Sequence, residues 1–285
     1  MVVCESESQV RQMLKDTLLP EESLGFVATM GALHEGHLQL LDSSMEQNDK
    51  TMASIFVNPL QFNESEDFKN YPTRTDEDLK LLEQRGCDFV FVPKAEDLYP
   101  KTPTVSIDLG PMAKILEGKF RPGHFDGVGI VVSKLFNIIS PTRAYFGLKD
   151  LQQYLLIKQM TLDLSFEVEV IGVPTARAAS GLALSSRNER LSPEGKGIAA
   201  NIFKGLIVFQ EAFNIGHDPW RARERMVSAY QQIPELEIEY VELLNIDGLE
   251  LLEPKQSFKD LAVCVAGYVE GIRLIDNLYL RHESS

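Results

Sequence analysis

The sequence feature that most constrains the fold of this chain is an apolar run followed by a glycine turn and then by an apolar helix. The run covers residues 24–28, the turn falls at Gly31, and the pattern His-Glu-Gly-His at 34–37 opens the helix. A fully apolar run of this length predicts a strand buried on both faces, as in a parallel sheet. A strand that turns on glycine and feeds a helix presents backbone N–H groups and the positive end of the helix dipole. We therefore expect a phosphate site there.

The two histidines of this pattern stand three residues apart, and residues at that spacing share one side of a helical turn. We expect His34 and His37 to face one bound phosphate, with Gly36 leaving the backbone open to close approach. The alternative is a histidine that only caps the helix or lies on its surface, and this stretch alone leaves it open.

The composition restricts the class of protein. The chain has 285 residues, of which 44% are hydrophobic and 25% charged, and a net charge of −14, which speaks against a nucleic-acid surface. It has no apolar run long enough to span a membrane, and its acidic N-terminus does not resemble a signal peptide. Its three cysteines lie far apart, which indicates a reducing compartment without disulfides or a zinc site. We expect a cytoplasmic protein with no nucleic-acid or membrane partner.

Strand and helix signals alternate through the first part of the chain. Helices are expected over 5–18, 76–85 and 128–139, and strands over 51–57, 87–93, 105–109 and 166–173. This alternation predicts an α/β fold with a Rossmann-like, doubly wound and mostly parallel sheet. Beyond Pro174 we expect helices over 192–213 and 218–232, then strands over 238–244, 261–269 and 272–280. They predict a smaller C-terminal α+β domain, so we place the domains at 1–175 and 176–285.

Polar side chains cluster in four of the predicted loops. In chain order they are His34 and His37, Asn58 and Gln61, Lys149 and Asp150, and Ser185, Ser186 and Arg187. Cations and histidines suit a polyphosphate, a carboxylate suits a ribose hydroxyl, and neutral amides suit a small polar organic substrate. The P-loop, the nucleophile-elbow serine motif and the dinucleotide fingerprint are all absent from the sequence. What remains is attack by a substrate on the α-phosphate of a nucleotide, which needs positioning and charge neutralisation.

Several of these residues have simpler structural alternatives. Asn58 could only shape the turn at Pro59, and Asp150 could only cap its helix. His124 could be a loop histidine without a ligand. The acidic residues 76–78 are expected to be a solvated helix start that complements the dipole, in preference to a magnesium site.

Six motifs, taken in order, resemble the pantothenate synthetase (pantoate–β-alanine ligase) family. They are Thr29–His37, Ser54–Phe62, Arg121–Val128, Lys134–Asn137, Phe146–Gln153 and Gly181–Asn188, and the match continues through Arg273–Asn277. The histidine pair resembles the HIGH signature of nucleotidylyltransferases and class I tRNA synthetases, and residues 184–187 stand where their KMSKS loop would be. Three positions depart from the family pattern, namely Ala28, Arg74 and Ser180.

The resemblance implies a two-step ligase reaction. The carboxylate of (R)-pantoate attacks the α-phosphate of ATP, releasing pyrophosphate and leaving pantoyl adenylate; β-alanine then attacks this mixed anhydride, giving pantothenate and AMP. Mg²⁺ would accompany the ATP phosphates, with no protein metal ligand assigned. The resemblance also implies a homodimer, a nucleotide- and pantoate-binding domain over 1–175 and a lid domain over 176–285. The alternatives are another small-molecule nucleotidylyltransferase, a non-catalytic nucleotide-binding regulator and a tRNA ligase.

The resemblance also assigns site residues. For ATP they are Met30, Gly31, Ala32, Leu33, His34, Glu35, Gly36, His37, Gly147, Leu148, Lys149, Asp150, Ala176, Leu184, Ser185, Ser186 and Arg187. For pantoate and β-alanine they are Gln61, Gln153 and Asn58, and the catalytic residues are His37, His34 and Lys149. The family names the second histidine as a proton donor. A carboxylate nucleophile needs no base, so we expect both histidines to act mainly by stabilising charge.

Overall fold

The structure is a computed structural model that describes residues 1–62, 68–69 and 71–281. The chain divides into two compact units. The first comprises Met1–Leu148 and Gln152–Pro174, and the second comprises Lys149–Leu151 and Thr175–Ser285. The short segment Lys149–Leu151 thus groups with residues far away in the sequence.

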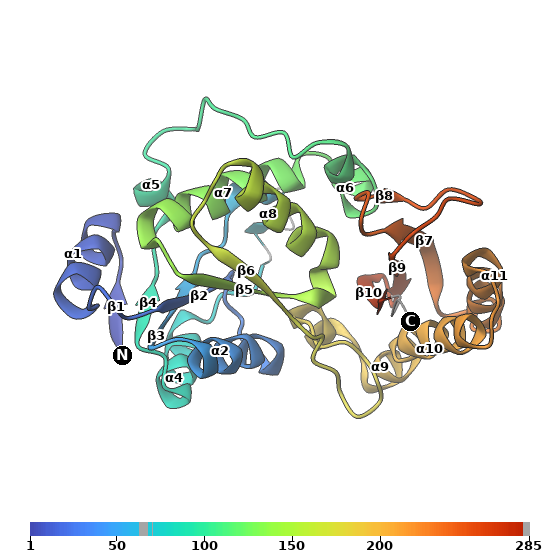
Figure 1. Cartoon of the computed structure of the whole chain (residues 1–285). Helices are drawn as coiled ribbons and strands as arrows, with labels where there is room; N and C mark the ends of the chain where they lie inside the picture. The colour runs from blue at the N-terminus through green and yellow to red at the C-terminus, as the bar shows by residue number, and fades with distance from the viewer. Residues whose placement is uncertain (63–67, 70, 282–285) are drawn as a thin grey trace. The chain divides into compact units, whose positions relative to one another are not determined.

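The first unit is built on one parallel sheet (Figure 1). Its strands are β1 (Val2–Cys4), β2 (Leu24–Thr29), β3 (Lys50–Ile55), β4 (Phe89–Phe91), β5 (Arg143–Gly147) and β6 (Glu169–Val173). Its α-helices are α1 (Glu7–Thr17), α2 (Glu35–Gln47), α4 (Thr75–Arg85), α5 (Ala95–Leu98), α6 (Glu117–Phe120), α7 (His124–Ile139) and α8 (Leu151–Asp163). Short 3-10 turns are η1 (Pro59–Gln61) and η2 (Pro111–Lys114), and of η3 (Leu148–Asp150) only Leu148 belongs to this unit.

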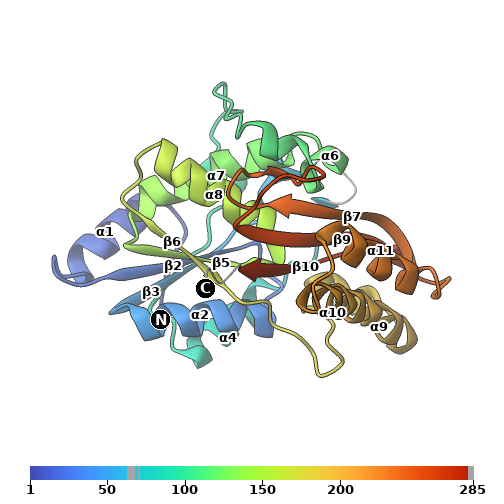
Figure 2. The ribbon, with the colours of Figure 1, turned by 45° about the vertical axis from the view of Figure 1, so that its right-hand side comes forward.

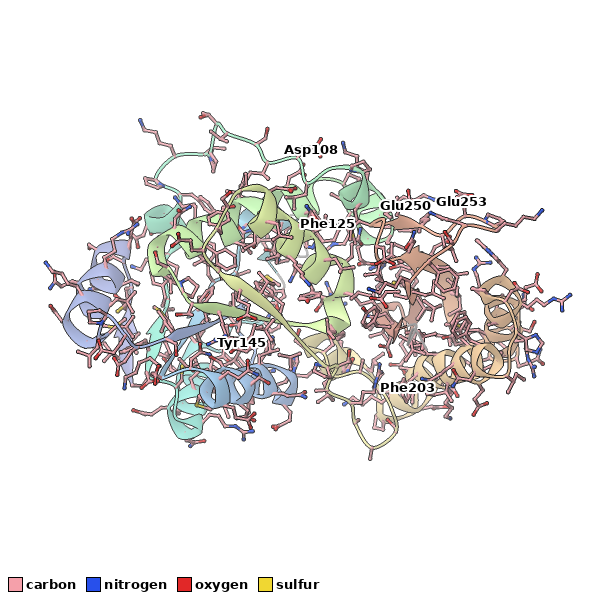
Figure 3. All side chains as sticks on the ribbon, viewed as in Figure 1. Asp108, Phe125, Tyr145, Phe203, Glu250 and Glu253 are labelled. Atoms are coloured by element: carbon pink, nitrogen blue, oxygen red, sulfur yellow. The ribbon has the colours of Figure 1, made fainter. Side chains whose placement is uncertain are left out.

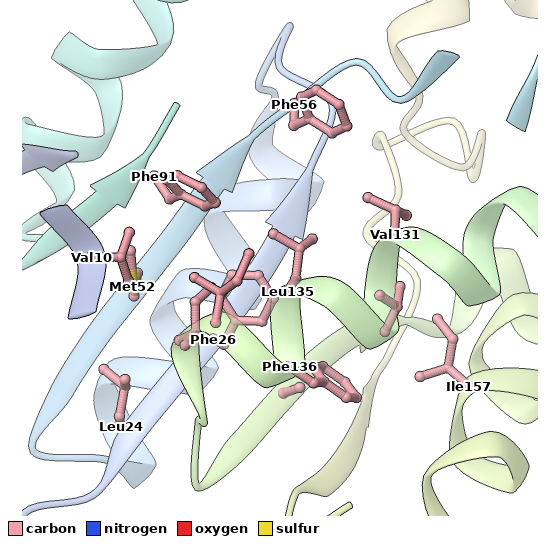
Figure 4. Packing of buried hydrophobic residues seen from close by; sticks show 14 of the residues in the cluster. Val10, Leu24, Phe26, Met52, Phe56, Phe91, Val131, Leu135, Phe136 and Ile157 are labelled. Atoms are coloured by element: carbon pink, nitrogen blue, oxygen red, sulfur yellow. The ribbon is translucent and has the colours of Figure 1, made fainter. Parts of the chain in front are cut away.

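Helices cover both faces of this sheet because successive strand residues point to opposite sides. On one face Phe26 and Met52 pack with α1, α7 and α8, as the close view in Figure 4 shows. On the other face Val27 and Ala53 pack with Leu41 of α2 and with α4. Burial on both faces explains why these strands read as continuous apolar runs.

The strand order places a ligand-binding position in the sheet. The order is β1-β4-β3-β2-β5-β6, and every neighbouring pair is parallel. From β2 the chain builds outward through β3 and β4 on one side and through β5 and β6 on the other. In such sheets ligands bind at the carboxyl ends of the two strands where the order reverses. These strands are β2, which ends before Met30, and β5, which ends at Gly147. The predicted Rossmann-like, doubly wound fold is confirmed.

The second unit has an antiparallel sheet flanked by helices, as the turned view of Figure 2 shows. The strand order is β10 (Ile272–Arg281), β9 (Asp260–Val269), β7 (Glu237–Asn245) and β8 (Glu250–Leu251). Its helical elements are η4 (Ser186–Arg190), α9 (Pro193–Ala199), α10 (Asn201–Asn214) and α11 (Pro219–Tyr230). Helix α10 meets α11 closely, since a Cβ on Gly205 would lie 2.2 Å from Tyr230 Cε1. This is the smaller α+β domain expected from the sequence.

Three local expectations are wrong. Residues 105–109 form no strand; instead Ile107 and Leu109 pack on Gly129 of α7, which has no side chain in their way. Helix α7 starts at His124, four residues before the expected start, because Gly123 takes a left-handed φ of 79° and begins it. The long helix expected over 192–213 is two helices that meet at Ala200.

Candidate active site

The histidine pair is held by reciprocal caps at the start of α2. His34 is the N-cap residue, and its Nδ1 accepts the Gly36 N–H at 3.1 Å. The Nδ1 atom of His37 accepts the His34 N–H at 3.3 Å, and the two ring centroids lie 4.1 Å apart. The two histidines therefore cap the helix, as the alternative interpretation held. Their rings also lie on the same side of one helical turn, as the spacing predicts.

These caps fix how the rings are protonated. A neutral imidazole accepts at one nitrogen and donates at the other. Because Nδ1 of each ring accepts a backbone N–H, the ring proton belongs on Nε2 in both His34 and His37. If Nδ1 of either ring also carried a proton, its N–H would point at the backbone N–H that it now accepts, and the hydrogen bond would be lost. The geometry therefore favours two neutral rings that act as Nε2–H donors.

The loop before the histidines is anchored by a buried carboxylate. Asp78 of α4 is only 2% exposed, and its two oxygens accept the N–H groups of Ala32 at 2.9 Å and Leu33 at 2.8 Å. The loop needs such an anchor because Gly31 and Ala32 have left-handed φ values of 83° and 50°. Burial raises the pKa of the Asp78 carboxyl, while the two amide hydrogen bonds oppose that shift.

This arrangement corrects two expectations. The acidic residues 76–78 are not uniformly solvated, because Asp76 and Glu77 are exposed while Asp78 is buried. The backbone N–H groups of this loop were expected to be open to a phosphate, but those of Ala32 and Leu33 are bound by the protein's own carboxylate. The local sequence carries no signal that singles out Asp78 from its acidic neighbours.

A buried amide cluster follows β3. Asn58 is 1% exposed, and its Nδ2 donates to Gln61 Oε1 and to the Gly127 carbonyl, both at 3.1 Å. Its Oδ1 accepts the Leu60 N–H at 3.3 Å and the Tyr99 hydroxyl at 3.1 Å. Asn58 thus shapes the turn and orients Gln61 through internal hydrogen bonds. Its contact with substrate stays a prediction.

Gln61 is the amide that joins the two strand ends. It is 7% exposed, and its Nε2 lies 3.0 Å from Met30 Sδ, in the loop after β2. The backbone carbonyl oxygen of Gln61 lies 2.8 Å from Nδ1 of His124, a residue that is 6% exposed in the first turn of α7. The Nε2 of His124 lies 3.3 Å from Arg121 NH1. His124 is therefore a buried support for Gln61.

Two adjacent glutamines at the start of α8 have different environments. Gln152 is 5% exposed and donates to the carbonyls of Met112 and Ile115 at 2.7 and 2.8 Å. It also accepts the Glu117 N–H at 3.0 Å, so it holds a loop. Gln153 is only half-buried, and its contact with substrate stays a prediction.

The remaining predicted residues of the first unit lie near the same sheet edge. Gly147 ends β5, and among the described residues other than its chain neighbours no heavy atom lies within 4 Å of the position a Cβ would take there. Leu148 follows it in η3. Glu35 lies in the first turn of α2, where its Oε1 is 3.6 Å from Arg85 NH2.

Within the second unit, the predicted residue Ala176 and the predicted segment 184–187 lie in a hairpin and in the turn that follows it. The Leu184 N–H donates to the Ala176 carbonyl at 2.9 Å, and Arg177 pairs with Ala183 between them. Ser185 then caps η4 by accepting the Arg187 N–H at 3.3 Å. Ser186 starts η4, and β10 contacts this turn.

Lys149 and Asp150 also belong to the second unit. The Lys149 side chain is 16% exposed, and its Nζ lies 3.9 Å from Asp150 Oδ1. Its backbone carbonyl accepts Asn277 Nδ2 of β10 at 2.9 Å. Asp150 directly precedes α8, the position of an N-cap, with an exposed side chain.

Two properties of the described residues bear on metal and membrane binding. Among residues 1–62, 68–69 and 71–281, no three His, Cys, Asp or Glu side chains are grouped so that they could hold a metal ion. Within the same part of the chain, no helix has the length and apolar character needed to cross a bilayer.

The fold and this edge of the sheet define a class of protein. A doubly wound sheet with a glycine turn, a helix start and two Nε2–H donors at its switch point is typical of α/β nucleotide-binding enzymes. Comparison with known proteins identifies the family. The family model described as pantoate-beta-alanine ligase matches residues 2–279. The chain belongs to this family.

Relatives and solved structures agree over nearly the full length. The chain is 46% identical to a pantothenate synthetase of Cytophaga hutchinsonii over 281 residues, 98% of this chain and 99% of that protein. It is 43% identical to one of Aquifex aeolicus over 271 residues, 94% and 95% of the two chains. A pantothenate synthetase structure from Thermus thermophilus has a TM-score of 0.90 at 40% identity, covering 98% and 99%.

A further structure bears on substrates. It is the pantoate-beta-alanine ligase of Francisella tularensis complexed with beta-gamma ATP and beta-alanine. Its TM-score is 0.79 at 34% identity, covering 98% of this chain and 97% of that one. The predictions of the family and of an enzyme are confirmed. The alternative, another small-molecule nucleotidylyltransferase, is not supported.

Proposed function

We propose that this protein condenses pantoate with β-alanine at the expense of ATP, through a pantoyl adenylate, and releases AMP and pyrophosphate. One observation carries the proposal beyond family membership. Two Nε2–H donors and a buried neutral amide, Gln61, occur at the carboxyl edge of the same sheet. Neutral donors next to a phosphate site suit a carboxylate substrate that must remain nucleophilic. A cationic pocket would bind that carboxylate more strongly in the ground state and lower its reactivity.

The first step needs positioning and charge stabilisation. Gln61 and Gln153 hold pantoate, so that one carboxylate oxygen faces the α-phosphorus of ATP. As the new P–O bond forms and the bond to pyrophosphate breaks, negative charge moves onto the phosphate oxygens. His34 and His37 donate to those oxygens through Nε2–H without transferring a proton. Lys149 and Arg187 neutralise the charge of the leaving pyrophosphate.

The second step forms the amide. The amine nitrogen of β-alanine attacks the carbonyl carbon of the adenylate, the bond to AMP breaks, and the amine loses a proton to solvent. Gln61 also binds β-alanine in this proposal. Asp150 and the backbone of Ala176 bind the ribose and the adenine, and the segment 184–187 closes over the phosphates.

Mg²⁺ binds with the ATP phosphates in this proposal. Mg²⁺ commonly keeps several waters and is held by substrate phosphates together with one or two carboxylates. In this proposal Asp150 binds the ribose, so the ion is held by the ATP phosphates and water, and no protein ligand is assigned to it. When bound, the ion supplies additional neutralisation of phosphate charge. We further propose that the enzyme is a cytoplasmic homodimer, as the family resemblance implies.

The decisive experiment follows AMP formation from ATP with each substrate omitted in turn. We expect AMP to accumulate only when pantoate and β-alanine are both present, with pantothenate in equal amount. With pantoate alone, we expect one equivalent of pyrophosphate per site and a bound adenylate. Release of AMP without either substrate, or pantothenate formation without pyrophosphate, would contradict the proposal.

A further inference from the structure

Strand β10 is an edge strand of the second sheet, and it carries two adjacent buried polar residues. Asp276 is 4% exposed and Asn277 is 7% exposed, in a strand that is otherwise largely apolar. Buried polar side chains require partners, and an edge strand also has outward-facing backbone groups to satisfy. Asp276 pairs with Arg177, the residue after the predicted ATP-binding residue Ala176, and Asn277 bonds to Lys149, which is itself predicted to bind ATP.

Asp276 fixes the hairpin that leads to the segment 184–187, which closes over the phosphates in the proposed function. Its carboxylate forms a bidentate pair with Arg177, at 2.5 and 2.9 Å. Arg177 also donates to the Gly181 carbonyl at 3.1 Å, and its guanidinium lies 4.0 Å from the ring centroid of Phe203, labelled in Figure 3. The same carboxylate accepts the Asn277 N–H at 2.8 Å, so it also fixes the backbone of the next residue.

Asn277 uses its side chain on a different segment. Its Nδ2 donates to the carbonyl of Lys149 at 2.9 Å, across 128 positions of sequence. Lys149 is part of the three-residue segment that groups with the second unit, although the residues on either side of it group with the first. The backbone from which the lysine side chain extends is therefore tied to β10.

We propose that Asn277 is a positioning residue for the reaction: it fixes the backbone of Lys149, so that the ammonium group meets the triphosphate of ATP. This rests on the proposed function. The lysine side chain is long and flexible, and stabilisation of developing charge depends on donors that are already in place. Asp276, itself held by Arg177, keeps Asn277 in the orientation this requires. One edge strand thus sets both the lysine and the hairpin before the segment 184–187.

The test is a double-mutant cycle on ATP affinity. We would measure the Kd for ATP with Mg²⁺ by calorimetry, without pantoate, in wild type, Asn277→Ala, Lys149→Ala and the double variant. One lost hydrogen bond predicts about three- to tenfold weaker binding for Asn277→Ala. In the Lys149→Ala background the same change should have almost no further effect, because the two residues act as one unit.

A matched control separates positioning from general destabilisation. Asn245 is also a buried asparagine of this sheet, 5% exposed on β7, a strand that β9 separates from β10. We expect Asn245→Ala to leave ATP affinity unchanged, even if it lowers the melting temperature as much as Asn277→Ala does. The inference would be overturned if Asn277→Ala weakened ATP binding equally in the wild-type and Lys149→Ala backgrounds. It would also be overturned if Asn245→Ala weakened ATP binding as much as Asn277→Ala does. Failure of the wild-type chain to bind ATP would overturn the proposed function as well, and this would already be evident without any variant.

Discussion

Replacing Asp78 with alanine should loosen the loop that precedes the histidine pair. The change removes both acceptors from the N–H groups of Ala32 and Leu33, which now lie 2.9 and 2.8 Å from the carboxylate oxygens. Hydrogen bonds to a charged group each contribute about 1.5–3 kcal/mol. The buried carboxylate also has a desolvation cost, seen in its raised pKa, which offsets part of this gain. We take the net loss as about 3 kcal/mol.

The sharpest assay is amide hydrogen exchange in the loop, combined with ATP affinity. A loss of about 3 kcal/mol in local opening free energy corresponds to exchange about a hundredfold faster at Ala32 and Leu33. The affinity for ATP should fall at the same time, because the left-handed conformation at Gly31 is no longer fixed. Asp76→Ala is the control, since Asp76 is an exposed acid in the same helical turn. If exchange and affinity in Asp78→Ala match this control, Asp78 does not anchor the loop.

Three further predictions concern the same edge of the sheet. Burial raises the pKa of Asp78 in the folded state above its ordinary value of 3.8. The contribution of Asp78 to stability is therefore complete below pH 3.8 and declines as the pH rises through the raised pKa. The stability advantage of wild type over Asp78→Asn in urea unfolding should therefore shrink from acid to neutral pH, and an advantage that grows would contradict the sign. In single-turnover adenylate formation, His37→Gln should keep most of the rate while His37→Ala loses about a hundredfold, since glutamine retains an N–H donor; equal losses would restore the proton-donor role. Tyr99→Phe removes the hydroxyl that donates to Asn58, so the KM for pantoate should rise about two- to fivefold; a change confined to the KM for ATP would argue against this role of the amide cluster.

Several features of the site follow from local sequence because local geometry controls them. The apolar run 24–28, the turn at Gly31 and the helix after it appear as β2 (Leu24–Thr29), a left-handed glycine and α2. The spacing of the two histidines is enough to place their rings on one side of a turn. Alternation of strands and helices is likewise enough to indicate a doubly wound sheet.

Other features depend on which elements pack together, and short-range patterns do not contain that information. Three consecutive acids open α4, yet only Asp78 points into the loop, because the packing of α4 on the sheet decides which side of the helix is buried. His124 lies in a glycine-rich segment, and only the approach of α7 to η1 brings it to Gln61.

The sequence by itself determined the strand–turn–helix unit, the chemical types of the site residues and the family to which the chain belongs. The tertiary structure decided which polar groups support the others: the carboxylate of Asp78 under the loop, and Asn277 behind Lys149. The reason is that backbone preferences and side-chain periodicity act over a few residues. A hydrogen bond that spans 128 positions instead requires two separate elements to be brought into register by burial of apolar surface.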